Sequence, residues 1–498
     1  MGIIQRQAIK NNIVSVLAVG VGVVSTLVVY PKDEALQGYI VAIASWALLL
    51  VPFVALGTTA VMVRFLPSLE GDRVAAAGQL FTRAAAVMTA VLLLLASVNG
   101  LVGDMAIRWL QSWGVANGVL AENRWTILGV LAALSYGGLV TTHLVNFKRI
   151  ALPVVFNNLL VKVATPLLFL LIFYGLADRV WLNPGIVVVY SLALAGVIAY
   201  AVYLGVLRLR WGKLKLKGVT TDDLYRLAAY SVFGAVGGRL AIYIDAITVN
   251  DILGESETGI YAFSTFVVSV IVIPNVAINS ITSPIVAEAW KDRDISQLGF
   301  LYRQSSLVLF ALGGLIYAGA LICLPFVYEW TDNLGKYTAG YYVVVFLGVA
   351  KLFDLLTSIN GNLIGMTDYY RWNVVFILVL GLLNVALNYT FIAVLEMGIT
   401  GAAIATMLSS VLYNVLKVLL IWWKMGLQPL TTGHLFTALA LCVFALCAWF
   451  VPAPTNPFLS VLVKGSVLTL PFLAFLRYTN SVPPVRRLFK EGLRGTFK

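Results

Sequence analysis

The chain has 498 residues, of which 60% are hydrophobic and 11% are charged, and its net charge is +12. Charged residues make up about a quarter of an ordinary soluble domain, so this composition excludes a soluble protein and indicates a polytopic membrane protein. Three cysteines and two histidines supply neither a disulfide framework nor a metal-ligand cluster. We therefore expect no metal and no cofactor.

Apolar runs long enough to cross a bilayer recur along the whole chain. Crossing ~30 Å of hydrocarbon takes roughly 20 residues at ~1.5 Å per residue. The sequence therefore predicts an all-α integral membrane fold with about 14 transmembrane helices and no inserted soluble domain. Their expected spans are 11–30, 38–62, 80–102, 124–146, 150–174, 184–207, 227–250, 258–283, 304–327, 339–361, 372–395, 398–423, 432–451 and 457–478.

Basic residues are distributed unevenly between the two sides of the membrane. If both termini are cytoplasmic, 23 of the 34 Lys and Arg residues lie inside, five lie outside and six lie within helices. Positive charge marks cytoplasmic loops, so we expect a multi-pass protein with its N-terminus and C-terminus inside. The basic surplus is then a signal of topology, and nucleic acid is not an expected partner. The longest basic loop, 208–226, is interpreted as a cytoplasmic linker.

Short sequence matches recur at a nearly constant spacing. Residues 153–158 (PVVFNN) match 373–378 (NVVFIL) at a shift of 220, and the stretches that begin at Gln37 and Thr258 match at 221. Six spans are an even number, so two such copies have the same orientation, as in transporters with parallel repeats. We expect a six-helix lobe at 1–210, a second at 211–425, helices 13 and 14 at 426–480 and a basic cytoplasmic tail at 481–498.

Three cations are expected near the middle of the membrane. Lys162 in helix 5, Arg239 in helix 7 and Lys351 in helix 10 each lie roughly 18 Å from the start of their helix at ~1.5 Å per residue. A charge at the bilayer centre costs roughly 2.5 to 3.5 kcal/mol, so such residues usually face a wet cavity or a bundle interior. We interpret the three as substrate-binding cations. For Arg239, an ion pair with another helix and snorkelling to lipid stay open.

Other polar residues within the helices fit contacts between helices. Asp245, six residues after the arginine of helix 7, is interpreted as a helix-contact or gating group. Asp354 lies three residues after the lysine of helix 10 and can pair with it. Asn384 and Asn388 share one helix face, where they can join helices or bond sugar hydroxyls. Three further cations lie nearer helix ends and are expected to snorkel: Lys417, Lys464 and Arg477.

Several stretches carry a family resemblance that spans essentially the whole chain. They are the start MGIIQRQAIKNN, helices 7 and 8 with Asp245, the triplet 259–261 (GIY) and Pro274, and helices 11 and 12 with Asn384, Asn388 and the triplet 401–403 (GAA). These stretches resemble the polysaccharide (O-antigen) flippase family of the multidrug/oligosaccharidyl-lipid/polysaccharide exporter superfamily.

The resemblance implies a V-shaped pair of six-helix lobes in the cytoplasmic (inner) membrane. Such a protein moves a polyprenyl-pyrophosphate-linked oligosaccharide to the outer leaflet for lipopolysaccharide, capsule or exopolysaccharide synthesis. The implied partners are the lipid-linked oligosaccharide and membrane lipid, with glycan polymerase machinery as a further candidate. Helices 13 and 14 are implied to shelter the polyprenyl tail.

Two other classes of function fit the sequence less well. A cation-coupled multidrug antiporter of the same superfamily would be expected to place a carboxylate within a lobe, but the interior of helices 1 to 6 contains no acid. A membrane enzyme would need a substantial outer loop and a catalytic constellation. The sequence shows neither, so we expect no catalytic residue and a protein that is not an enzyme.

Overall fold

A computed structural model describes residues 3–68, 72–112, 118–212, 220–330, 332–479 and 481–483. Among these residues, 14 helical spans are long and apolar enough to cross a membrane. The expected all-α membrane fold is therefore confirmed. The basic linker around Lys215 and most of the predicted tail lie outside the described residues.

Packing divides the chain into two compact units, Met1–Gly259 and Ile260–Lys498. The division groups α10 (Thr221–Leu253) with the segments before it. Two units that each pack compactly do not show whether their sequences or folds are repeats of one another. The predicted lobes at 1–210 and 211–425 therefore stay a prediction.

The helical segments of the first unit follow in chain order. They are α1 (Ile3–Val24), η1 (Ser25–Val29), η2 (Tyr30–Lys32), α2 (Glu34–Ala55), α3 (Thr58–Phe65), η3 (Leu66–Ser68), α4 (Arg73–Ser112), α5 (Val119–Glu122), α6 (Arg124–Asn146), α7 (Ala151–Val154), η4 (Val155–Leu160), α8 (Val161–Phe173), η5 (Arg179–Trp181), α9 (Leu182–Tyr203) and α10.

The second unit begins within α11 (Glu255–Ser269). Its further segments are η6 (Val270–Val272), α12 (Ile273–Lys291), α13 (Ile295–Tyr328), η7 (Asp332–Gly340), α14 (Tyr341–Thr357), α15 (Asn360–Gly365), α16 (Tyr370–Asn388), η8 (Tyr389–Val394), α17 (Gly398–Met425), α18 (Thr432–Phe450) and α19 (Pro457–Tyr478).

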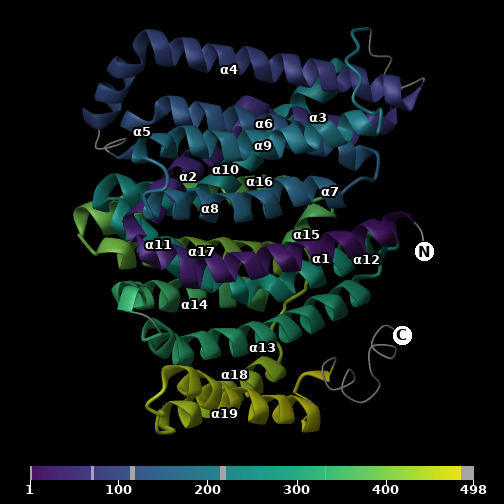
Figure 1. Ribbon diagram of the computed structural model, residues 1–498. Helices are drawn as coiled ribbons and strands as arrows, with labels where there is room; N and C mark the ends of the chain where they lie inside the picture. Colours follow the sequence, from purple (N-terminus) through teal and green to yellow (C-terminus); the bar gives the residue numbers. More distant parts are fainter. Residues whose placement is uncertain are drawn as a thin grey trace. The chain divides into compact units, whose positions relative to one another are not determined.

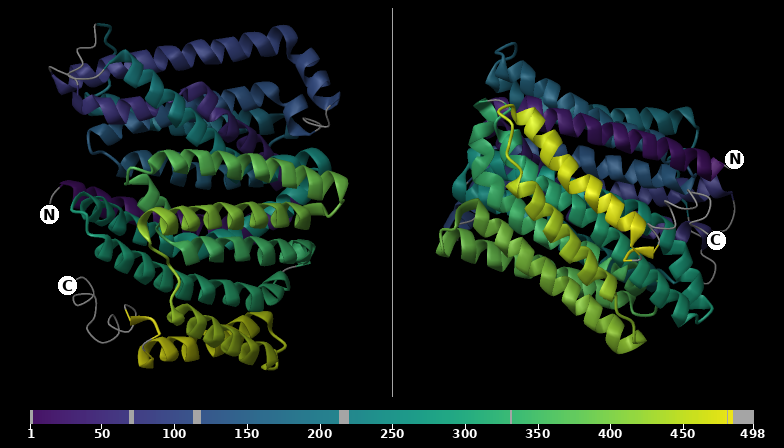
Figure 2. Two further views of the ribbon diagram at one scale, coloured as in Figure 1. Left: turned by 180° about the vertical axis from the view of Figure 1, so that it is seen from behind. Right: turned by 90° about the horizontal axis from the view of Figure 1, so that it is seen from below.

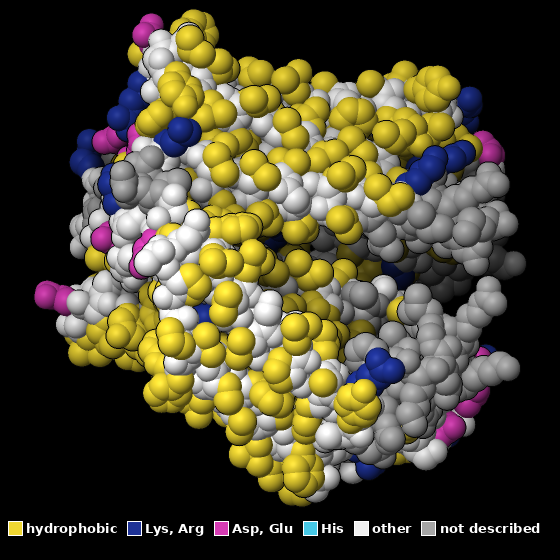
Figure 3. Space-filling model, turned by 60° about the horizontal axis from the view of Figure 1, so that its bottom comes forward, with side chains coloured by type: hydrophobic (Ala, Val, Ile, Leu, Met, Phe, Trp, Pro, Cys, Tyr) yellow, Lys and Arg dark blue, Asp and Glu magenta, His cyan; other side chains and the backbone are white. Residues whose placement is uncertain are grey.

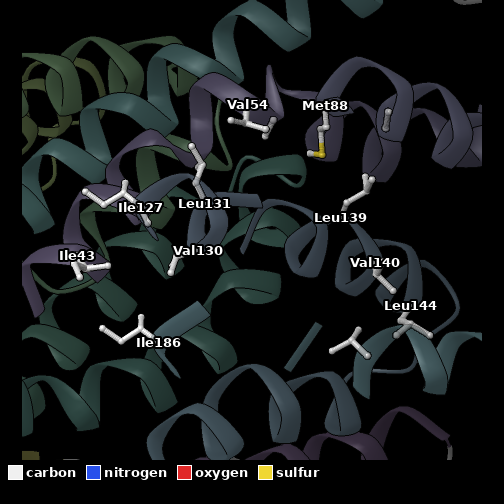
Figure 4. Packing of buried hydrophobic residues seen from close by; sticks show 14 of the residues in the cluster. Ile43, Val54, Met88, Ile127, Val130, Leu131, Leu139, Val140, Leu144 and Ile186 are labelled. Atoms are coloured by element: carbon white, nitrogen blue, oxygen red, sulfur yellow. The ribbon is translucent and has the colours of Figure 1, made fainter. Parts of the chain in front are cut away.

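The core of the first unit is built around α6. This helix packs against α9 and α2, and the long α4 runs alongside it (Figure 1). Figure 4 shows how Ile43 of α2, Met88 of α4, Leu131 of α6 and Ile186 of α9 contribute to one buried apolar cluster. Close packing of such side chains, rather than exclusion of water, holds helices together in lipid.

Several predicted spans are interrupted rather than continuous, and two of the interruptions have a clear local cause. The span expected at 38–62 is divided into α2 and α3 at Leu56 and Gly57, which have φ angles of 42° and 71°. Glycine is required at 57, because a Cβ there would lie 2.4 Å from the Ala228 carbonyl oxygen. The span expected at 258–283 is divided by η6, which precedes Pro274 in the first turn of α12. Proline lacks an N–H and is favoured at a helix start.

In the second unit, α14 packs against α17 and α13, and α16 packs against α17. The hairpin of α18 and α19 lies beside α13, as the yellow pair in Figure 2 shows. Hydrophobic side chains cover most of the middle of the face in Figure 3, and the Lys, Arg, Asp and Glu side chains in that view lie mainly toward its left and right edges. This distribution is what a membrane-spanning surface requires.

Candidate substrate cavity

A cavity of about 430 Å³ lies within the first unit, between α2, α6, α9, α10 and the broken helix of η4 and α8. Pockets of this size hold small ligands or parts of larger ones. Its polar lining consists of Asn157, Asn158, Lys162, Tyr190, Arg239 and Tyr243. Two of the three predicted substrate-binding cations, Lys162 and Arg239, therefore lie in the same cavity although they are 77 positions apart in the sequence.

Arg239 is half-buried on α10 and is oriented by the tyrosine one turn further along the helix. Its Nη1 donates a hydrogen bond of 3.3 Å to the Tyr243 hydroxyl, and its guanidinium lies 5.5 Å from the centre of that ring. Among the described residues, no carboxylate forms an ion pair with Arg239. An ion pair with another helix is thus not seen in the described part of the chain, and most of the guanidinium donors are available to a ligand.

Lys162 reaches the cavity from the first turn of α8, directly after the π-helical segment η4. A π-helical stretch has hydrogen bonds between residues five apart, and it often occurs at functional sites. Asn157 and Asn158 lie inside η4 and line the cavity with the lysine. Asn157 donates to the Thr141 hydroxyl at 2.8 Å, whereas Asn158 is exposed. Its amide is therefore positioned to bond a ligand.

The chemistry of this lining favours an anion. It contains two cations and no carboxylate, so an anionic group gains attraction from both without meeting a like charge. A guanidinium binds phosphate oxygens in pairs through its planar fork, and an ammonium adds a point charge. The amides and tyrosine hydroxyls nearby can donate to, and accept from, hydroxyl groups.

The remaining predicted cation and its acid lie in the second unit. Lys351 Nζ is 3.6 Å from Asp354 Oδ2, so the predicted pairing within one helix is present. Lys351 does not line the cavity of the first unit. The structure thus brings together Lys162 and Arg239 and gives Lys351 a carboxylate partner of its own.

Three of the predicted helix-contact residues, Asp245, Asn384 and Asn388, are buried. Asp245 is 5% exposed on α10 and is not among the residues that line the cavity. Asn388 donates to Asn384 Oδ1 at 3.0 Å, and Thr406 of α17 donates to the same oxygen at 3.2 Å. These bonds join α16 to α17, which supports contact between helices rather than sugar binding for the two asparagines.

Sequence reasoning missed three features of the described residues. Tyr190 of α9 lines the cavity, but an aromatic residue within an apolar run carries no signal of its own. Lys417 and Lys464 were expected to snorkel, and this was wrong, because each is only 5% exposed. Lys464 donates to the carbonyl oxygens of Ala448, Trp449 and Val451 at 2.8 to 3.0 Å.

Known structures resemble this fold over most of its length. A lipid II flippase MurJ in an inward closed conformation has a TM-score of 0.70 at 12% identity, covering 95% of this chain and 98% of MurJ. An inward-facing multidrug resistance MATE transporter has a TM-score of 0.61 at 13% identity, covering 83% and 94%. A MOP superfamily transporter from Pyrococcus furiosus has a TM-score of 0.52 at 14% identity, covering 85% and 95%.

These likenesses show that the chain has the fold seen in MOP superfamily transporters. No protein-family model matches the sequence. No curated protein matches it either.

Proposed function

We propose that this protein is a flippase that moves a polyprenyl-pyrophosphate-linked oligosaccharide from the cytoplasmic to the outer leaflet of the inner membrane. The cargo would serve synthesis of lipopolysaccharide with O-antigen, capsule or exopolysaccharide, with glycan polymerase machinery as the partner that receives it. The neighbour MurJ is a flippase for another lipid-linked substrate, lipid II.

The observation that carries this proposal is the cavity that holds Lys162 and Arg239 without a carboxylate. A pyrophosphate loses hydration when it enters the membrane, so it needs cationic donors along its path. Asn158 and Tyr190 supply polar groups beside these cations for the sugar that follows the pyrophosphate.

The second unit contains an apolar groove that is suited to a lipid tail. The groove, of about 520 Å³, runs between α13, α14 and α18, with Tyr317, Tyr341, Leu441 and Trp449 in its lining. Its walls are almost wholly apolar, as a polyprenyl chain requires. The predicted helix 13 corresponds to α18, which lines the groove. The predicted helix 14 corresponds to α19, which does not line it.

A cation-coupled multidrug antiporter is the second candidate, because a MATE transporter is among the structural neighbours. The cavity argues against it. Two cations in a lining without carboxylates repel a cationic drug, and an antiporter of such drugs needs the opposite polarity.

The test is a paired assay in a bacterium that lacks its own flippase. We expect the gene to restore surface glycan and to leave resistance to cationic drugs unchanged. Glycan restoration requires matching the sugar repeat, so several strains with different repeats should be compared. Raised drug resistance without restored glycan in any strain would favour the antiporter.

A further inference from the structure

The first unit contains a second polar cavity, which shares no lining residue with the cavity of Lys162 and Arg239. It has a volume of about 400 Å³ and is formed by α5 and by the turn between α10 and α11. Because α10 follows the linker predicted to be cytoplasmic, its end is expected on the outer side of the membrane. We refer to this space as the outer pocket. Its lining residues are Gly118, Val119, Glu122, Asn250, Asp251, Ile252, Leu253, Gly254 and Glu255.

A glycine shapes the turn on one side of the outer pocket. Helix α10 ends at Leu253, and Gly254 follows with a φ of 95°, a conformation that residues with a side chain rarely adopt. The Gly254 N–H donates to the carbonyl oxygens of Val249 and Asn250 at 3.2 and 3.1 Å. Nothing lies within 4 Å of a Cβ built at Gly254. The turn therefore ends α10 and leaves open space beside its backbone.

Asn250 joins this turn to α5 through one end of its amide. The Val119 N–H donates to Asn250 Oδ1 at 3.2 Å, so the oxygen end of the amide faces α5 and the nitrogen end faces away from it. Asn250 is only 3% exposed, and no described residue accepts a hydrogen bond from its Nδ2. A buried donor without an acceptor is costly. The Asn250 amide is therefore suited to an acceptor atom of a ligand in the outer pocket.

Three carboxylates line the same pocket: Glu122 of α5, Asp251 of α10 and Glu255 of α11. The described lining contains no Lys or Arg. Arg179 Nη2 lies 3.9 Å from Glu255 Oε2, but Arg179 is 72% exposed and does not line the pocket. Ionised carboxylates accept hydrogen bonds and donate none. A ligand thus meets several acceptors together with the Nδ2 donor of Asn250.

This combination argues against an ion as the ligand. Three carboxylates repel a phosphate or a pyrophosphate. An ammonium group has donors only, so it cannot accept a hydrogen bond from Asn250. The described residues contain no group of three or more His, Cys, Asp or Glu side chains arranged to hold a metal ion. A hydroxyl group both donates and accepts, and a sugar ring carries several hydroxyl groups close together.

We propose that the outer pocket binds a neutral saccharide. Asn250 Nδ2 donates to an oxygen of the sugar, and sugar hydroxyl groups donate to the carboxylates of Glu122 and Asp251. Hydrogen bonds to an ionised acceptor are about twice as strong as those between neutral groups, so the acids favour a ligand rich in hydroxyl donors. They also keep anionic ligands out.

The outer pocket complements the cationic cavity along one helix. Arg239 and Asn250 both belong to α10 and are 11 positions apart, which is roughly 16 Å along the helix axis at ~1.5 Å per residue. A lipid-linked glycan has an anionic pyrophosphate and a polyhydroxyl part, and each part matches one of the two sites. That the bound sugar belongs to the cargo rests on the proposed function, whereas saccharide binding itself does not.

A binding assay on the whole purified protein tests this proposal. The probes are neutral oligosaccharides built from hexoses, 6-deoxyhexoses and N-acetylhexosamines. They are screened on a glycan array, and the strongest binder is then titrated by saturation-transfer NMR. We expect the parent to bind neutral glycans and to bind the same glycans more weakly when they carry a sulfate or a phosphate, because the carboxylates repel these groups.

Asn250→Asp separates a saccharide from a cation. It keeps an oxygen acceptor for the Val119 N–H and replaces the Nδ2 donor by an acceptor, so saccharide affinity should fall about 10-fold or more. The same change adds a fourth carboxylate to the pocket and would strengthen the binding of a cation. Calorimetric titrations with Ca²⁺ and with spermidine measure that alternative on the parent and the variant.

Glu122→Gln carries the test if Asn250→Asp folds poorly, because Glu122 is exposed on the short helix α5. It replaces an ionised acceptor by a neutral one, so saccharide affinity should fall roughly 3-fold to 10-fold. Asp178→Asn is the matched control. It neutralises an exposed acid of the first unit that does not line the pocket, and its affinity should equal that of the parent.

Three results would overturn the proposal. They are a parent that binds no neutral glycan, equal saccharide affinity in the parent and in folded Asn250→Asp and Glu122→Gln, and binding of Ca²⁺ or spermidine that tightens in Asn250→Asp. The last result would assign a cation site instead.

Surface glycan in the paired assay then distinguishes this inference from the proposed function. If the parent restores surface glycan but binds no neutral saccharide, the outer pocket fails and the flippase stands. If saccharide binding depends on Asn250 but no strain regains its glycan, the flippase fails and the outer pocket stands. If both hold, Asn250→Asp should also lower surface glycan, and unchanged export would show that the bound sugar is not that of the cargo.

Discussion

Arg239 and Lys464 are both cations within membrane-spanning helices, yet their surroundings give them different roles. Arg239 lines a cavity and donates a hydrogen bond to the Tyr243 hydroxyl. Lys464 is buried against three carbonyl oxygens at the end of α18. The last carbonyls of a helix have no partner within the helix, and in a membrane water cannot supply one. The first side chain is therefore suited to a ligand and the second to the fold.

Arg239→Ala should lower transport of the lipid-linked glycan by roughly 10-fold to 100-fold, because a hydrogen bond to a charged group is worth about 1.5–3 kcal/mol. Membrane abundance should not fall, since no described carboxylate is left without a partner. Arg239→Lys should be intermediate, because it keeps the charge and loses the fork. Surface glycan and immunoblots of the same cells measure both. Normal export by Arg239→Ala would remove this residue from the site.

Lys464→Met should destabilise the protein by about 1.5–3 kcal/mol, because buried carbonyl oxygens lose a charged donor. The readout is the midpoint of thermal unfolding in detergent. Arg477→Met is the matched control, since Arg477 is an exposed cation on the same helix, and its midpoint should stay near that of the parent. Equal midpoints for both variants would show that the carbonyl contacts contribute little.

At the scale of elements, glycines set how closely helices approach in the first unit. A Cβ at Gly38 of α2 would lie 1.8 Å from the Glu255 carbonyl oxygen, and one at Gly259 would lie 2.0 Å from that of Glu34. The two backbones thus touch where α2 and α11 begin. Small residues allow such close contact between membrane helices, and it adds van der Waals packing that larger side chains would prevent.

Gly38→Val should separate these backbones and destabilise the protein by about 1–3 kcal/mol. Gly20→Val is the control, because nothing lies within 4 Å of a Cβ built at Gly20 of α1. Thermal unfolding in detergent compares the two variants with the parent. A Gly38→Val protein as stable as Gly20→Val would mean that the contact between α2 and α11 relaxes at no cost.

At the scale of the whole molecule, orientation in the membrane follows from charge. The uneven distribution of Lys and Arg predicts that both termini and the linker around Lys215 are cytoplasmic. The ion pair between Arg124 and Asp104, at 2.5 Å, joins two segments that this topology places on the outer side.

Lys215→Cys should therefore resist an impermeant thiol reagent added to intact cells. Lys336→Cys, at an exposed position of η7 that this topology places outside, should be labelled under the same conditions. Opening the cells should make both positions reactive, which controls for burial. Labelling of Lys215→Cys from outside would reverse the predicted orientation.

The sequence by itself determined the number and type of the membrane spans, because spanning a bilayer requires about 20 apolar residues in one run. It also singled out Lys162 and Arg239, since a charge near the middle of the membrane is costly and usually faces a wet cavity or a bundle interior. Only the tertiary structure decided which cations share a cavity, because Lys162 of α8 and Arg239 of α10 are 77 positions apart in the sequence and meet only where several helices of the first unit enclose one space.

The partners of Lys417 and Lys464 were likewise decided only by tertiary structure, since depth along a helix does not show what the facing helix presents. The breaks at Gly57 and Ser358 depend on contacts with Ala228 and Ser305 that are distant in the sequence. Local hydropathy shows where a chain crosses the membrane. The three-dimensional arrangement decides which buried charge meets a ligand, a carboxylate or a backbone carbonyl.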